Sequence, residues 1–112
     1  MSAVAADAQE RIARNEATFR RINEDIGRGR DAEDDTTLVG FVCECGDSEC
    51  SRLIEMTPAE YQRVRSDPRH FAVVNGHEIP EVERVLDRTD RYTVVEKQPP
   101  GDKIAMETDP RA

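Results

Sequence analysis

The stretch that decides the fold runs from Leu38 to Met56 and reads L-V-G-F-V-C-E-C-G-D-S-E-C-S-R-L-I-E-M. Its β-branched and aromatic start, residues 38–42, predicts a strand, and residues 52–56 predict the return strand. Between these two strands lie all three cysteines of the chain, Cys43, Cys45 and Cys50. The sequence therefore predicts a β-hairpin with a cysteine knuckle at its tip.

The spacing of the cysteines, C-x-C-x4-C, is compatible with a metal site. On an extended strand Cys43 and Cys45 project from the same face, and Gly46 gives the backbone the freedom to return Cys50 toward them. Zinc prefers four tetrahedral ligands, mostly thiolate and imidazole. In a reducing compartment thiols more often bind metal or do redox work than form stable disulfides. A structural zinc ion is the leading interpretation, and a redox-active pair or ordinary buried cysteines are the alternatives.

A closed zinc site needs a fourth ligand from outside the cysteines. His77 follows Asn75-Gly76, where a turn can aim an imidazole at the knuckle, whereas His70 lies at the start of a predicted strand. The predicted metal ligands are therefore Cys43, Cys45, Cys50 and His77. The alternatives for the fourth position are His70, Glu44, Asp47 and Glu49.

Local signals outside the knuckle predict one short helix and further strands. Thr57 as N-cap, Pro58 at the first helical position and Glu60 closing a capping box predict a helix through Ser66. Strands are predicted over 71–74 and 92–95. Residues 80–89 fit either a helix or a strand, and a strand is favoured because a four-residue connection to the next strand would form a hairpin.

These elements predict an α+β fold: an N-terminal amphipathic helix plus a small antiparallel sheet with one short helix and the cysteine knuckle. The predicted segments are a helix over 1–26, an acidic flexible linker over 27–37, the knuckle domain over 38–97 and a disordered tail over 98–112. The apolar stripe of the N-terminal helix is formed by Ala5, Ala8, Ile12, Phe19, Ile22 and Ile26, with Asn15 on the same line. This narrow stripe either packs on its own domain or docks on another chain.

Size and charge limit the possible functions. A chain of 112 residues supports one domain. A formal net charge of −8 argues against nucleic-acid binding through counterion release, which needs a basic surface. No stretch approaches the roughly 18 consecutive apolar residues of a membrane span, and no secretory signal is visible. We therefore expect no nucleic-acid or membrane partner and a cytoplasmic location.

The chain resembles a small, poorly characterised bacterial protein family in four motifs and an N-terminal helix. The motifs are F-x-C-E-C-x4-C, M/L-T-x-x-E-Y-x-x-V-R, F-x-V-x-x-G-H-E and Y-x-V-V-E-K, and the helix is of the type R-x-A-R-N-E-A-x-F-R. They correspond here to Phe41–Cys50, Met56–Arg65, Phe71–Glu78, Tyr92–Lys97 and Arg11–Arg20. The resemblance implies no established reaction. It favours His77 over His70 as a ligand, although Asn75 stands where the family usually has proline.

The leading hypothesis for function is a non-enzymatic, zinc-stabilised interaction or regulatory module. Its N-terminal helix would dock on a protein partner or on a second copy of the chain. One alternative is a thiol redox sensor that uses Cys43, Cys45 and Cys50. Another is a small zinc enzyme with Glu78 as acid/base, although the sequence lacks H-E-x-x-H and H-x-E followed by C-x-x-C.

Overall fold

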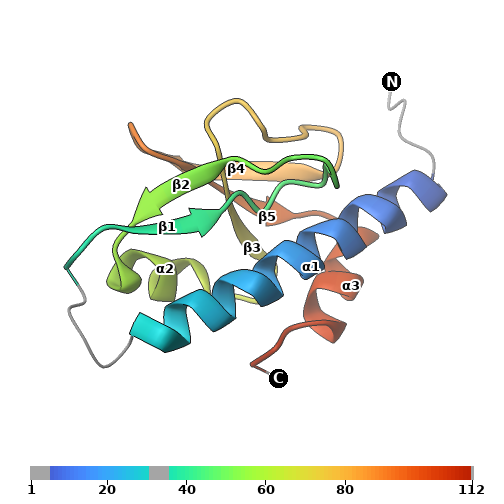
Figure 1. Cartoon of the computed structure of the whole chain (residues 1–112). Coiled ribbons are helices and arrows are strands. Elements are labelled where there is room, and N and C mark those ends of the chain that lie inside the picture. The colour runs from blue at the N-terminus through green and yellow to red at the C-terminus, as the bar shows by residue number, and fades with distance from the viewer. Residues whose placement is uncertain (1–5, 31–35, 112) are drawn as a thin grey trace.

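A long helix, two small antiparallel sheets and two short helices make up the fold (Figure 1). The computed structural model describes residues 6–30 and 36–111. Helix α1 (Ala6–Arg30) runs beneath the sheets, with α2 (Pro58–Val64) at one end of the sheets and α3 (Gly101–Glu107) beside α1. The predicted α+β class is confirmed. The sheet predicted as one is divided into two.

The hairpin that carries the cysteines is confirmed. Strand β1 (Val39–Val42) pairs antiparallel with β2 (Leu53–Met56), and Val42 lies opposite Leu53 at the end next to the connecting loop. Beyond that pair the backbone N–H of Cys43 still donates to the carbonyl of Arg52, at 2.9 Å. The connection between the two strands therefore starts and ends at a defined point, and it contains the three cysteines.

The second sheet has three strands in the order β3-β5-β4, with β5 (Thr93–Lys97) in the middle. Strand β3 (His70–Val73) pairs antiparallel with β5, and β4 (Glu83–Arg88) pairs antiparallel with its other edge. The ambiguous segment 80–89 thus contains a strand. Its apolar residues Val85 and Leu86 are 41% and 40% exposed.

Helix α2 begins where its capping signals predict. The side chain of Thr57 accepts from the N–H of Glu60 at 3.1 Å, and Glu60 accepts from the N–H of Thr57 at 2.9 Å. The two bonds satisfy backbone donors that a helix start leaves open. Tyr61 and Val64 are buried, and the ring of Tyr61 stacks on Phe41 with 4.6 Å between centroids. This packing fixes α2 against the hairpin.

Helix α1 packs on its own chain, and it does so through a mainly polar face. The residues of α1 that it buries are Ala13, Glu16, Arg20, Asn23, Glu24 and Gly27. The predicted apolar stripe lies at the border of this face, and Ile22 is 42% exposed. The stripe packs on its own domain in part, since Ile26 lies against the core and Ile12 against Gly46, but polar residues make up most of the buried face. The reason is that α1 lies against backbone carbonyls and charged side chains, which bind polar groups.

The boundaries of α1 also differ from the prediction. The helix continues to Arg30, four residues past the predicted end at Ile26, so the first part of the predicted linker is helical. The remainder of that linker, residues 31–35, lies outside the described residues, as do residues 1–5 of the predicted helix.

The tail predicted to be disordered contains helix α3, which packs against α1. Its Gly101 and Ala105 are buried, and Arg20 of α1 donates to the carbonyl of Ala105 at 2.8 Å. Residues beyond α3 form ion pairs with buried side chains: Arg111 binds Glu24 at 2.6 Å, and Asp109 binds Arg65. The composition of this segment gave no apolar signal. The charged side chains of this segment are held in place because they pair with the buried charged side chains of Glu24 and Arg65.

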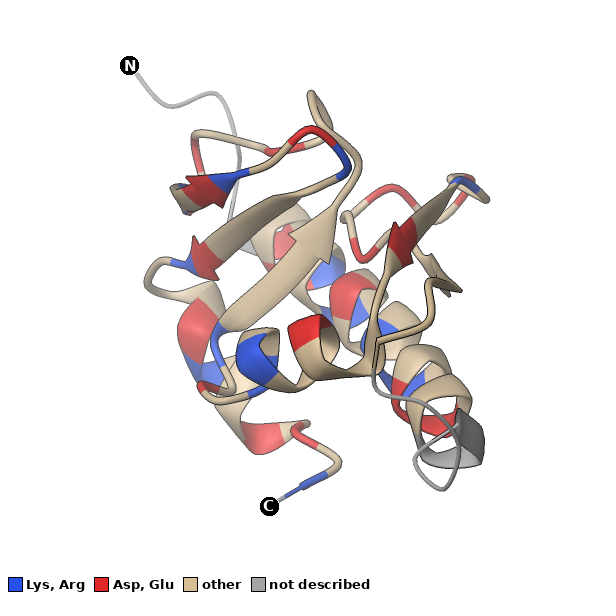
Figure 2. Cartoon of the chain, turned by 90° about the vertical axis from the view of Figure 1, so that its left-hand side faces the viewer, with Lys and Arg blue, Asp and Glu red and all other residues tan. Residues whose placement is uncertain are grey.

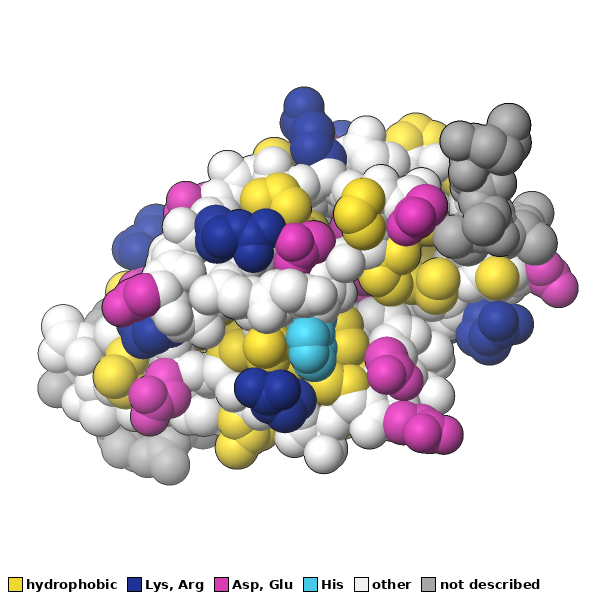
Figure 3. Space-filling model, turned by 90° about the horizontal axis from the view of Figure 1, so that it is seen from above, with side chains coloured by type: hydrophobic (Ala, Val, Ile, Leu, Met, Phe, Trp, Pro, Cys, Tyr) yellow, Lys and Arg dark blue, Asp and Glu magenta, His cyan; other side chains and the backbone are white. Residues whose placement is uncertain are grey.

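Charges of both signs are mixed over the surface. Lys and Arg alternate with Asp and Glu along the helices in Figure 2. On the face in Figure 3, hydrophobic side chains lie among charged ones, and a histidine lies between hydrophobic side chains and next to a Lys or Arg. Within residues 6–30 and 36–111, no helix combines the length and the apolar composition needed to cross a membrane.

Candidate metal centre

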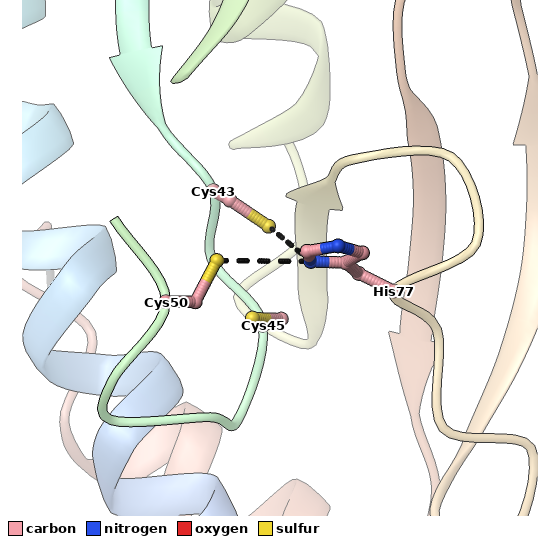
Figure 4. Close-up of side chains that lie close together, drawn as sticks. All are labelled: Cys43, Cys45, Cys50 and His77. Carbon is pink, nitrogen blue, oxygen red and sulfur yellow. Dashed lines mark hydrogen bonds between the residues drawn. The ribbon is translucent and has the colours of Figure 1, made fainter. Parts of the chain in front are cut away.

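Four side chains from two separate segments, the β1–β2 connection and the turn after β3, meet beside the hairpin (Figure 4). The potential ligand atoms of Cys43, Cys45, Cys50 and His77 all lie within 4.8 Å of one another. His77 Nδ1 is 3.6 Å from Cys43 Sγ and 3.7 Å from Cys50 Sγ. Tetrahedral zinc with sulfur at about 2.3 Å and nitrogen at about 2.0 Å would separate these atoms by about 3.5 Å. The spacing therefore fits one zinc-sized ion.

The cysteine loop is shaped by a turn at Asp47. The side chain of Asp47 accepts from the N–H of Glu49 at 2.9 Å, and its carbonyl accepts from the N–H of Cys50 at 3.0 Å. An aspartate that binds the backbone two residues ahead is a common means of forming a tight turn. This turn returns Cys50 toward Cys43 and Cys45, and it explains how three cysteines within eight positions converge.

His77 reaches the cysteines from the end of β3. The N–H of Val74 donates to Cys43 Sγ at 3.2 Å, and the carbonyl of Val74 accepts from the N–H of His77 at 2.8 Å. Between them Gly76 has φ of 94°, a conformation that favours glycine. The Asn75-Gly76 turn therefore aims the imidazole at the sulfurs, as the sequence predicted.

The environment of the sulfurs favours a shared negative charge. The thiol of Cys45 donates to Cys43, which lowers the pKa of Cys43 and raises the pKa of Cys45. The N–H of Val74 also stabilises a thiolate at Cys43. Cys43 and Cys45 are buried, while Cys50 and His77 are half-buried. A metal cation would replace the proton that the two buried sulfurs share.

One side of the centre is open to solvent. A hollow of about 200 Å³ is lined by Cys45, Asp47, His77 and Ile79. The opposite side is closed by an apolar cluster that includes Phe71, Val73, Val95 and Ala105. Two of the four candidate ligands, Cys45 and His77, therefore border the hollow.

Helix α1 supports the cysteine loop directly. Asn15 donates to the carbonyl of Gly46 at 2.9 Å. A Cβ at position 46 would lie only 2.3 Å from Cγ2 of Ile12, so the loop and the helix approach as closely as a glycine allows. Asn15, which lies on the apolar stripe of the sequence, thus binds the cysteine loop.

Replacing Gly46 by alanine is expected to lower the free energy of unfolding by about 1–3 kcal/mol, because the added methyl overlaps Ile12. Gly40→Ala is the matched control, since its Cβ would meet Leu53 at an ordinary 3.5 Å. Urea unfolding of both variants measures the difference. Equal stability of the two variants would contradict the close approach of α1 to the loop.

Glu44, an alternative ligand in the sequence, faces away from the cysteines and into the core. Its carboxylate accepts from the hydroxyl of Tyr61 at 2.7 Å, from Asn23 Nδ2 at 2.9 Å and from the N–H of Ala72 at 3.0 Å. Burial raises the pKa of Glu44, and these three donors act in the opposite direction. Glu44 therefore joins the loop to α1, α2 and β3. The two remaining acidic candidates, Asp47 and Glu49, are exposed.

Asn23 has a role that the sequence did not indicate. Its amide donates to the carbonyl of Val42 and accepts from the N–H of Val42, each at 2.7 Å. This pair of bonds replaces the strand neighbour that β1 lacks on that edge. Because Val42 precedes Cys43, the position of the first cysteine depends on α1.

His70, the other alternative, belongs to a different cluster with Asp67 and Glu96. Its Nε2 lies 3.2 Å from a Glu96 oxygen and 3.7 Å from an Asp67 oxygen. Arg69 bridges the same two carboxylates, at 2.9 Å to Asp67 and 3.3 Å to Glu96. The hydrogen bond from Arg69 lowers the pKa of Asp67 to about 2. The guanidinium thus supplies the positive charge that a metal ion would bring.

Comparison with protein-family models, with curated proteins and with solved structures found no match to this chain.

Proposed function

We propose that Cys43, Cys45, Cys50 and His77 bind one zinc ion, and that this ion stabilises a non-enzymatic interaction or regulatory module. The observation that carries the proposal is the convergence of three sulfurs and one imidazole nitrogen within 4.8 Å. Three thiolates and one imidazole form a common ligand set for structural zinc. The choice of zinc over other soft divalent ions rests on this ligand set.

Two features support a structural role for the ion. First, its ligands come from the β1–β2 connection and from the turn after β3, so one ion would cross-link the two sheets. Second, the apolar cluster beside the sulfurs is small, and metal binding adds folding free energy to a chain with 4% aromatic residues and no tryptophan.

Replacing His77 by alanine is expected to reduce zinc affinity strongly, while His70→Ala leaves it unchanged, because only His77 lies among the cysteines. Both proteins are purified without a histidine tag. Zinc content is measured by elemental analysis and affinity by chelator competition. If the His77→Ala protein retains one zinc with wild-type affinity, His77 is not a ligand. If the wild-type protein does not bind zinc, the proposal is refuted.

The enzymatic alternative is disfavoured by the surroundings of Glu78. Its carboxylate binds Arg88 at 2.7 Å and accepts from the N–H of Gly76 at 3.1 Å. The hydrogen bond from Arg88 lowers the pKa of Glu78. A general acid/base works best with a pKa near the working pH, so this carboxylate is a poor candidate.

A thiol redox sensor is the second candidate function, favoured by the open hollow beside Cys45 and by the half-burial of Cys50. A peroxide would accept two electrons from two thiols and be reduced to water, as a disulfide forms and the metal leaves. Zinc released by hydrogen peroxide and bound again after reduction would support this function over a purely structural one.

The docking role of the N-terminal helix is supported less directly. The buried face of α1 is occupied by its own chain, so a protein partner or a second copy would meet the outer face, where Ile22 is 42% exposed. This role remains a prediction.

A further inference from the structure

Three charged side chains meet in the interior, far along the chain from the cysteine loop. Glu16 comes from the middle of α1, Glu83 from the start of β4 and Lys97 from the end of β5. All three side chains have an exposed fraction of 0%. Lys97 Nζ lies 2.8 Å from Glu16 Oε1 and 3.8 Å from Glu83 Oε1. The cluster joins α1 to the three-stranded sheet.

Helix α3 closes this cluster from one side. A Cβ at position 101 would lie 2.8 Å from Cε of Lys97 and 3.6 Å from Cβ of Ala13. Gly101 is therefore required for α3 to pack over the lysine stem. The charges are enclosed by backbone and by apolar atoms, so neither bulk water nor dissolved ions screen them.

The cluster has one negative charge too many if both carboxyl groups are ionised. One ammonium balances one carboxylate, and an uncompensated charge in the interior is strongly unfavourable. Among the described residues, Glu16 Oε2 has no hydrogen bond or ion pair, and Glu83 Oε1 has only its 3.8 Å ion pair with Lys97. By contrast, Glu83 Oε2 accepts from the N–H of Ile79 at 2.9 Å.

Glu16 Oε1 and Glu83 Oε1 face the same ammonium, at 2.8 Å and 3.8 Å from Lys97 Nζ, so the two carboxyl groups lie in the same enclosed space. Two carboxylates cannot hydrogen-bond to each other, because neither has a proton to donate. One added proton removes the excess charge and turns the contact of the two carboxyl groups into a hydrogen bond. Glu83 is the better acceptor, because a backbone N–H already stabilises its negative charge.

We propose that the Glu16–Glu83–Lys97 cluster is a buried proton-binding site, in which Glu16 holds a proton at neutral pH and donates it to Glu83. Loss of this proton leaves two carboxylates facing one ammonium and weakens the attachment of α1 to the sheet. The cluster thereby forms a pH-sensitive latch. It shares no residue with the cysteine loop, so it does not depend on metal binding.

The charged groups around Glu16 agree with this assignment. Burial is the largest cause of a pKa of Glu16 well above its ordinary value; the charge of Glu83 raises it further, and Lys97 lowers it. Arg20, one turn further along α1, is directed to the carbonyls of Pro68 and Ala105. On α3 the buried residues are Gly101 and Ala105, while Asp102 is half-buried and Lys103 and Glu107 are exposed.

The proton makes the stability of the fold depend on pH. In the unfolded chain Glu16 loses its proton near the ordinary glutamate pKa, whereas in the folded chain it keeps the proton to a higher pH. The contribution of the site to stability is therefore complete below the pKa of Glu16 in the unfolded chain. It is lost in the window between that pKa and the higher pKa of Glu16 in the folded chain, as pH rises. Within the window the unfolding equilibrium constant rises by up to about tenfold per pH unit.

The direct test is an NMR titration of the side-chain carboxyl carbon of Glu16 in the zinc-loaded full chain. The proposal expects the shift of a protonated carboxyl group at pH 7, with ionisation only at higher pH. A carboxylate shift at pH 7 would overturn it. This measurement on the unaltered chain does not require any variant to fold.

The second test compares unfolding of Glu16→Gln with that of the wild type between pH 5 and pH 9. Glutamine keeps a donor for Glu83 and cannot ionise, so the variant is expected to lose the pH dependence that Glu16 causes. Glu10→Gln is the matched control, because Glu10 lies on the exposed side of α1 and pairs with Arg14. Parallel curves for wild type and Glu16→Gln would also overturn the proposal.

Discussion

Replacing Cys45 by serine is expected to abolish stoichiometric zinc binding and to destabilise the hairpin and the turn after β3. Cys45 is 2% exposed, and its sulfur lies within 4.8 Å of the other three ligand atoms. Replacing it by serine therefore removes one of the four ligands. A ligand present at a thousandfold excess over its Kd contributes about 4 kcal/mol to stability, and a loss of this size is expected. Zinc content and thermal unfolding measure the two effects.

The matched control is Ser51→Ala, an exposed position next to Cys50. It is expected to retain one zinc and wild-type stability. Addition of a strong chelator to the wild type should reproduce the loss caused by Cys45→Ser. If the variant binds one zinc with unchanged affinity, Cys45 is no ligand; if the metal-free wild type is as stable as the zinc-loaded form, the ion is not structural.

Replacing Glu44 by alanine is expected to lower the free energy of unfolding by about 3 kcal/mol or more. The change removes the acceptor of three buried donors, from Tyr61, Asn23 and Ala72. Each buried donor left without a partner costs about 1–3 kcal/mol. Because Glu44 lies between Cys43 and Cys45, zinc affinity should fall as well, although Glu44 contacts no metal. Chemical unfolding and chelator competition measure both quantities.

Glu49→Ala is the control, since Glu49 is an exposed glutamate in the same loop. Its effect on stability is expected to stay within about 0.5 kcal/mol, as for most exposed positions. Glu44→Gln separates charge from shape, because the amide keeps one acceptor oxygen and adds a donor that needs its own partner. Equal stability of Glu44→Ala and Glu49→Ala would show that the buried carboxylate does not hold the loop.

The parts of the fold that sequence reasoning predicted correctly are those with a local cause. The capping box of α2 needs only Thr57, Pro58 and Glu60, and the turn before His77 needs only a glycine at positive φ. The hairpin follows from two apolar runs of matching length. The choice of His77 over His70 rested on the turn directly before His77 together with the resemblance to the bacterial family.

The errors occurred where the interaction partners lie far apart in the chain. Helix α1 was expected to use its apolar stripe, yet it buries Glu16, Arg20 and Asn23, whose partners come from β5, from α3 and from β1. The segment with helix α3 was expected to be disordered because of Pro99, Pro100, Gly101 and the charged residues that follow. A pattern of hydrophobic residues contains no information on such polar contacts, because it records apolar burial alone.

The sequence by itself predicted the secondary structure around the cysteines and favoured His77 among several candidates for the fourth position, since turns and caps depend on neighbouring residues. Only the tertiary structure decided which face of α1 is buried, that Glu44 holds the loop and that Glu16, Glu83 and Lys97 share one enclosed space. The physical reason is that a charged or amide side chain can be buried only where a complementary group already lies. That position is a property of the whole fold.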